Sequence, residues 1–246
     1  MKKQDNSTFA DIICDLRTRK IKKTFFNQVN TLLNWNKISN IINNHYVRGK
    51  SATGLPSYDG LLLFKMCLLQ TWYGLSDYEV EDRVNDSLSF SSFCGLHIEQ
   101  VAPDHSTLSR FRTAMTKANA YELLFKEINQ QLESHQIIVK KGAIIDASVI
   151  DTPLKPKGKT NYEVTKDRED QQEISANKVY ADSVDKEASW LKKGDRYRYG
   201  YKKHYVTDNE GLVLGVFTTK ASTNEISILE EVLNAADLPE NIPLKA

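Results

Sequence analysis

Apolar side chains in the first half of the chain recur at the spacing of amphipathic helices. Between residues 25 and 42 they return every three or four positions, which predicts two helices. A strongly apolar stretch follows, which we expect to begin at Pro56-Ser57 and to end at Gly74. Ser76 and Glu79 have the spacing of a capping box, which marks the start of a further helix. The expected helices cover about residues 25–33, 38–42, 56–72, 76–84, 88–93, 104–115 and 120–132.

The pattern changes after residue 136. An apolar, β-branched run surrounds Asp146 and predicts a buried strand. A polar segment, residues 152–196, follows it, and we expect a functional or mobile insertion because loops of that length are uncommon in compact domains. The remaining pattern predicts a hairpin over residues 199–207 and 212–219, a helix over 224–236 and the start of a strand at 242–246. The expected fold class is α+β, with an all-helical block (1–136) before an α/β domain (137–246).

Composition narrows the class of protein. The chain has 246 residues, of which 40% are hydrophobic, so it can form one large core or two small ones. Its three cysteines form no metal-type pair, and no apolar run is long enough to span a bilayer. We therefore expect a cytoplasmic protein without a membrane partner. The net charge is only +1, but five cations gather between Arg17 and Lys23, a patch that suits polyanions or an ordinary solvated helix face.

The carboxylate of Asp146 is the first candidate for chemistry. A lone charged carboxylate in a buried strand costs several kcal/mol unless a cation compensates it, and a metal ion is the usual cation where phosphate is handled. No second carboxylate is an easy partner. Asp151 has an odd offset from Asp146 and belongs to a loop, Asp208 suits the hairpin turn, and Glu225 completes a capping box with Ser222.

The segment that starts at Pro103-Asp104 is the second candidate. Leu108 and Phe111 can pack inward, which leaves hydroxyls and arginines outside. With two short helices just upstream, this predicts a helix-turn-helix whose second helix enters a major groove; an ordinary capped surface helix is the alternative. On the later strand a histidine lies among lysines, where a hydrogen-bonded or phosphate-facing role is expected. The candidate DNA-binding residues are Ser106, Ser109, Arg110, Arg112, Lys202 and His204.

Four segments together resemble one family. Residues 77–93, 103–112, 139–148 and 199–204 are similar, in that order, to bacterial insertion-sequence transposases of the insertion-sequence-five group. The resemblance covers most of the chain from about Pro56 to Ala246. It implies a ribonuclease-H-like domain with a DDE triad, in which Asp146 matches the first Asp. The second Asp is expected just beyond Ala246, and the Glu further on.

The resemblance also implies cofactor and partners. In a complete family member three carboxylates hold two Mg²⁺ ions that serve cleavage and strand transfer on double-stranded DNA at terminal inverted repeats. Such transposases are expected to act as homo-oligomers. Because only Asp146 of the triad falls within the sequence, we expect a polypeptide that ends before the site is complete, with no strand transfer of its own.

Three readings stay open at this point. The first is a transposase whose missing part is supplied elsewhere. The second is a catalytically dead DNA-binding remnant that still recognises the ends of the element. The third is an unrelated α+β protein in which Asp146 is structural, and an absence of salt-dependent DNA binding would favour it.

Overall fold

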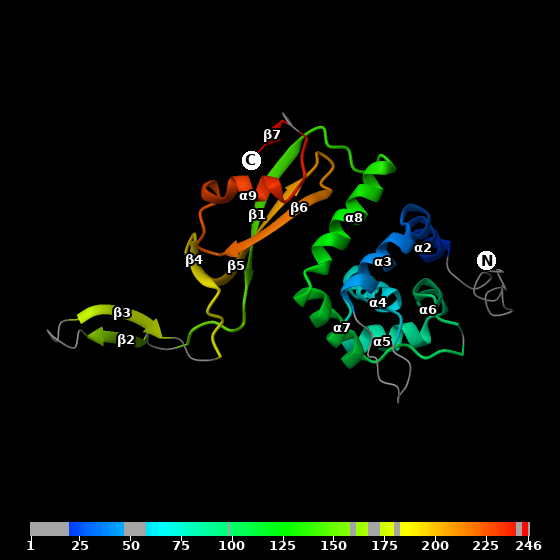
Figure 1. Ribbon diagram of the computed structural model, residues 1–246, viewed down its shortest axis with the longest axis horizontal. Helices are drawn as coiled ribbons and strands as arrows, with labels where there is room; N and C mark the ends of the chain where they lie inside the picture. Colours follow the sequence, from blue (N-terminus) through cyan, green and yellow to red (C-terminus); the bar gives the residue numbers. More distant parts are fainter. Residues whose placement is uncertain are drawn as a thin grey trace. The chain divides into compact units, whose positions relative to one another are not determined.

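The computed structural model describes residues 20–46, 58–97, 99–157, 161–166, 173–179, 183–239 and 243–245. The chain divides into two compact units, residues 1–137 and 138–246 (Figure 1). In the first unit every described element is a helix, and in the second the described elements are mainly strands, so the fold is α+β. The side chains of the basic segment Arg17–Lys23, the expected helix start at Pro56-Ser57 and the last residue, Ala246, lie outside the described residues.

The predicted helices of the first unit are confirmed. The ends follow ordinary capping chemistry: Ser76 and Glu79 form the expected capping box, and Gly74 and Gly95 end their helices with positive φ angles of 63° and 82°. The helix expected from Pro56-Ser57 begins later, because Asp59 caps it by accepting a hydrogen bond from the amide of Leu61. The helices are α2 (Lys20–Leu32), α3 (Trp35–His45), α4 (Gly60–Tyr73), α5 (Asp77–Asp86), α6 (Leu88–Cys94), α7 (His105–Lys117) and α8 (Ala120–Ser134).

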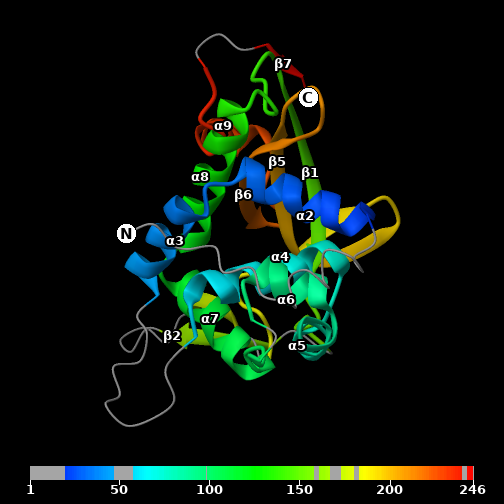
Figure 2. The same cartoon turned by 90° about the vertical axis from the view of Figure 1, so that its right-hand side faces the viewer.

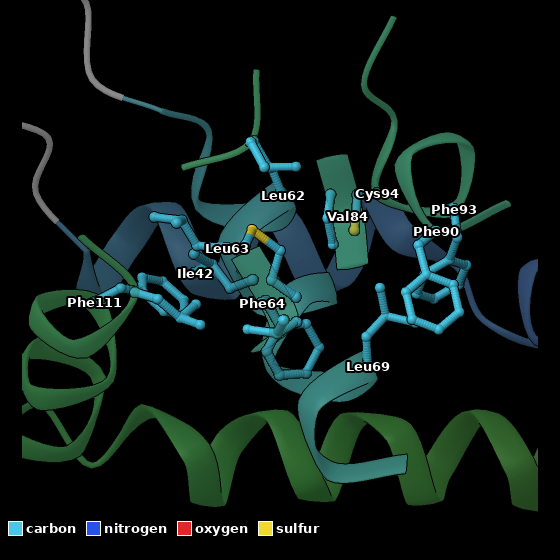
Figure 3. Packing of buried hydrophobic residues seen from close by; sticks show 14 of the residues in the cluster. Ile42, Leu62, Leu63, Phe64, Leu69, Val84, Phe90, Phe93, Cys94 and Phe111 are labelled. Atoms are coloured by element: carbon cyan, nitrogen blue, oxygen red, sulfur yellow. The ribbon is translucent and has the colours of Figure 1, made fainter. Parts of the chain in front are cut away.

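Helix α4 is the centre of the first unit, since it contacts α3, α5, α6 and α7. Leu63 and Leu69 of α4 are fully buried, and Figure 3 shows them among side chains of the surrounding helices. These include Ile42 from α3 and Phe111 from α7, both also fully buried. Burial of each such side chain stabilises the unit by about 1.5–3 kcal/mol. This core fixes the position of α7, on which the candidate DNA-binding residues Ser106, Ser109, Arg110 and Arg112 lie.

The second unit contains more strands than the sequence predicted. The segment 152–196, expected to be a loop, contains three strands, which are held by antiparallel pairing between β2 and β3 and between β4 and β5. The strands are β1 (Ala143–Asp151), β2 (Asn161–Lys166), β3 (Glu173–Val179), β4 (Ser189–Lys193), β5 (Arg196–Thr207), β6 (Val213–Lys220) and β7 (Leu244–Lys245). Strands β2 and β3 pair only with each other in the described chain.

Strand β5 organises the main sheet of this unit (Figure 2). Strand β1 pairs antiparallel along one of its edges, while β4 and then β6 pair along the other. Strand β7 lies on the far side of β1 and runs parallel to it, within the segment 242–246 where the start of a strand was predicted. The order from edge to edge is therefore β6-β5-β1-β7, with β4 beside the first half of β5.

The two faces of this sheet differ. Alternate residues of β5 are buried from Lys202 to Val206, on the face that carries helix α9 (Leu229–Asn234). Close packing there needs a glycine, because a Cβ on Gly215 of β6 would meet the backbone of Ala236 at 2.7 Å. The other face of β5 is half-buried in the described structure, and it is the face with the candidate chemistry.

The helix predicted over residues 224–236 is shorter than expected. A 3₁₀ turn, η1 (Ile226–Ile228), precedes α9, and the expected apolar face is only partly used because Ile226 is 81% exposed. The capping box predicted for Ser222 and Glu225 does not form. Glu225 instead pairs with Lys202, and Asn224 accepts the hydrogen bond from the amide of Ile226.

Candidate functional site

Asp146 lies in the middle of β1, opposite Tyr205 of β5. Residues directly opposite in an antiparallel pair share a face of the sheet, so Asp146 and Tyr205 lie on the face away from α9. Ser148 and its partner Lys203 are the next pair on that face. The candidate site is therefore an open sheet face with one carboxylate, one ammonium group and two hydroxyl groups.

The expectation that Asp146 is buried was wrong. Its side chain is exposed, and the neighbouring Ile144 and Ile145 are only half-buried. The reason is the pairing of β1: β7 covers this edge only at Ala143 and Ile144, so the part of the strand with Asp146 has a described neighbour on one side only. The carboxylate accepts a hydrogen bond of 2.7 Å from the amide of Ala147. Its ionised form therefore needs no metal to offset burial.

The other carboxylates considered as partners are used elsewhere. Asp151, expected in a loop, is the last residue of β1 and makes an ion pair of 2.9 Å with Arg198. Asp208 holds the hairpin turn, as predicted, by accepting hydrogen bonds from the amides of Glu210 and Leu212 at 3.0 and 2.8 Å. Within the described chain no three His, Cys, Asp or Glu side chains come together as a metal site. The described residues do not by themselves form a magnesium site.

Lys202 and His204 lie on the face opposite to Asp146. Both are buried, with 8% and 1% of their surface exposed. The ammonium of Lys202 donates to the carbonyl of Thr223 at 3.0 Å, and His204 Nε2 lies 3.0 Å from the hydroxyl of Thr219. Burial, with the nearby charge of Lys202, lowers the pKa of His204 and favours the neutral ring. The predicted DNA contacts of both residues stay predictions, and in this structure neither is presented to a duplex.

The helix α7 has the two faces that the sequence predicted. Asp104 caps it by accepting a hydrogen bond of 2.9 Å from the amide of Thr107. Hydrogen bonds from the hydroxyls of Ser106 and Thr107 lower the pKa of the Asp104 carboxyl. Leu108 and Phe111 are fully buried. The exposed face carries hydrogen-bonding side chains at successive turns: Ser106, Ser109, Arg110 and Thr113.

Arg112 is not available on that face, which corrects the expectation from sequence. Its guanidinium donates two hydrogen bonds of 2.6 Å to the carboxylate of Asp77 on α5 and one of 2.6 Å to the side-chain oxygen of Gln70 on α4. On the same side, His105 donates its backbone amide to Glu81 at 2.8 Å, and its ring stacks on Tyr78. These contacts fasten α7 to α5, and Arg110 remains as the exposed arginine of the described face.

Sequence reasoning missed Lys203. It shares the face of Asp146, and in the described part of the chain its ammonium makes no hydrogen bond or ion pair. The sequence shows three consecutive candidates, Lys202, Lys203 and His204, which alternate between faces. Only the register with β1 decides which of them accompanies Asp146.

The arrangement defines a class of protein. An Asp on the first strand of a sheet ordered β6-β5-β1-β7, with three antiparallel strands and a parallel fourth, fits part of a ribonuclease-H-like domain. Comparison with known families adds two matches. A family model described as "Transposase domain (DUF772)" matches residues 15–114, and one described as "Transposase DDE domain" matches residues 138–244. The chain therefore belongs to the DDE transposases of insertion-sequence type.

The family sets the broad biochemistry. It implies DNA as the partner and typically a divalent metal as cofactor. No solved structure matched the chain. Of the helices that the structure describes, none has the length and apolar character needed to cross a membrane.

Proposed function

We propose that this transposase binds the ends of its insertion sequence through α7, and that Asp146 belongs to the carboxylate set for DNA cleavage and strand transfer. The observation that carries the proposal is the position of Asp146 on β1, a strand that pairs antiparallel with β5 and, at its first two residues, parallel with β7. In the ribonuclease-H-like arrangement a carboxylate at this position faces the scissile phosphate. Membership of the insertion-sequence-five group and assembly into homo-oligomers are parts of the same proposal.

The exposed face of α7 supports the DNA-binding part. Arg110 is exposed, and its only described hydrogen bonds are to Ser106 and Thr107 within its own helix. A protein–DNA contact can replace these bonds without breaking the core, because Leu108 and Phe111 hold the opposite face. Hydroxyl and guanidinium groups are the donors that contact phosphates and guanine edges in a major groove.

Fluorescence anisotropy tests this part. A labelled duplex with the DNA that flanks the coding sequence is titrated with the full chain at several salt concentrations, and a scrambled duplex is the comparison. We expect Arg110→Ala to weaken binding and to reduce the slope of log affinity against log salt by about one. Lys126→Ala is the matched control, because Lys126 pairs with Glu122 at 3.0 Å on α8 and lies outside the proposed surface. Equal affinity of the Arg110→Ala variant and the unaltered chain would exclude α7 as the binding helix.

A second candidate function is a DNA-binding protein without catalytic activity, which competes with active transposase for the same ends. It is favoured by the absence, in the described chain, of a carboxylate group that completes a metal site with Asp146. A nicking assay on supercoiled DNA with Mg²⁺ separates the two candidates. Nicking that is lost in Asp146→Asn supports the enzyme. Specific binding without nicking by the full chain supports the second candidate.

A further inference from the structure

A cavity of about 340 Å³ lies at the end of β1 away from β7, against β4 and β5. Three aromatic side chains line it: Trp190 of β4, and Tyr197 and Tyr199 of β5. Lys155 and the ion pair between Asp151 and Arg198 complete its charged part. Its volume falls in the range of small-ligand sites. Neither the fold nor the proposed use of Asp146 accounts for this site.

The three aromatic side chains differ in exposure: one is buried and hydrogen-bonded, and the other two are open to solvent. Tyr199 is only 3% exposed, and its hydroxyl donates a hydrogen bond of 2.6 Å to the carbonyl of Asp185. Trp190 packs on this fixed ring with a centroid distance of 5.1 Å, yet 40% of Trp190 is exposed. Tyr197 is 67% exposed. The rings of Trp190 and Tyr197 are thus exposed to solvent, and the Trp190 ring packs on the buried Tyr199.

The charge around the rings is positive. Lys155 lines the cavity, and Lys192 lies with its ammonium 5.7 Å from the centre of the Tyr197 ring. The one carboxylate that lines the cavity, Asp151, accepts hydrogen bonds of 2.9 and 3.0 Å from Arg198 and is neutralised by it. A ligand with a flat ring and a negative group would therefore meet stacking surfaces together with the ammonium groups of Lys155 and Lys192.

The aromatic side chains of the cavity lie on the same sheet face as Asp146, whereas Asp151 and Arg198 are at the alternate positions of their strands. Tyr205, opposite Asp146, and Tyr199 are both at odd positions of β5, so their side chains leave the strand on one side. They are six positions apart, a distance of about 20 Å along the strand. Lys203 lies between them on this face. A nucleic-acid strand that passes Asp146 along β5 would reach the cavity after a few nucleotides.

The geometry points to a site for one unstacked base of single-stranded DNA. The base stacks on Trp190 and Tyr197, and the phosphates beside it lie near Lys155 and Lys192. The inference rests on the proposed function, because it takes DNA as the substrate. It adds a binding site for a strand that has left the duplex, separate from both α7 and Asp146.

The test compares single-stranded and duplex DNA on the full chain. Anisotropy of a labelled oligothymidylate and of the flanking duplex is measured for the unaltered chain, Trp190→Ala and Trp190→Phe. We expect Trp190→Ala to weaken single-strand binding at least about tenfold and Trp190→Phe to retain most of it, because loss of one stacking ring has effects of that size. Duplex affinity is expected to stay the same in both variants, and circular dichroism checks that each is folded.

Two neighbouring lysines provide a matched control. Lys192 and Lys193 are both exposed on β4, but they alternate between faces, and only Lys192 lies near Tyr197. We expect Lys192→Gln to weaken single-strand binding and Lys193→Gln to leave it unchanged. Equal effects of the two changes, or unaltered single-strand affinity in Trp190→Ala, would overturn the inference while duplex binding still supported the proposed function. If the unaltered chain bound neither single-stranded nor duplex DNA, the result would contradict the proposed function as well.

Discussion

The guanidinium of Arg112 on α7 donates two hydrogen bonds, each 2.6 Å long, to the carboxylate of Asp77 on α5. Bidentate pairs of this kind combine charge with fixed geometry. About a third of each side chain is exposed, so the pair lies at the edge of the core. Its consequence is a fixed orientation of the helix that presents Ser106 and Arg110, so Arg112 positions the proposed DNA-binding face.

Removal of this pair should loosen α7. We expect Asp77→Asn to lower the free energy of unfolding by about 1–3 kcal/mol at pH 7, because Arg112 then loses a charged acceptor. The hydrogen bonds from Arg112 lower the pKa of Asp77 below its ordinary value of 3.8. The stabilisation is therefore complete above that value and is lost as the pH falls through the lower pKa of the folded state. Urea unfolding at neutral and acid pH measures both effects, with the exposed Asp82→Asn as control.

Lys202 and Lys203 are adjacent lysines with opposite expected roles. We expect Lys202→Met to destabilise the second unit by about 1–3 kcal/mol, because the carbonyl of the half-buried Thr223 loses its donor. Lys203→Met should change stability by less than about 0.5 kcal/mol, as for an ordinary surface change. Hydrogen exchange of the β5 amides measures the change in stability for both variants. A larger effect for Lys203 would contradict the assigned faces of β5.

His204 should make the second unit sensitive to mild acid. Because burial lowers the pKa of His204 in the folded state, the unfolded chain takes up a proton first as the pH falls below about 6.5. Stability is then lost progressively until the pH reaches the lower pKa of the folded state. Unfolding curves at pH 7.5 and 5.5 should differ more for the unaltered chain than for His204→Gln. An identical pH dependence in that variant would show that another group is responsible.

Gly200 is the position where β1 and β5 approach too closely for a side chain. An added Cβ would lie 2.0 Å from the carbonyl oxygen of Ile150, a backbone atom that cannot move aside alone. We expect Gly200→Ala to destabilise the sheet by about 1–3 kcal/mol, the usual range for overpacking. The exposed Thr218→Ala is the comparison in thermal unfolding. Similar melting temperatures for the two variants would mean that the strands separate easily at this point.

The sequence predicted the helices of the first unit well because their signals are local. The capping box at Ser76 depends on residues three positions apart, and Leu108 and Phe111 show the helical period within one turn. It predicted the strand with Asp146 and the hairpin turn at Asp208 for the same reason. It failed over residues 152–196, where the strands pair through hairpins with little apolar pattern.

What the sequence determined by itself was the set of elements, the resemblance to a transposase and the choice of Asp146. What only the tertiary structure decided was which residues share a surface. Asp146 is exposed because β7 covers only the start of β1. Arg112 forms an ion pair with Asp77 of another helix, and the register of β1 and β5 places Lys203 on the same face as Asp146. These are contacts between residues far apart in the chain, and a local pattern does not encode their partners.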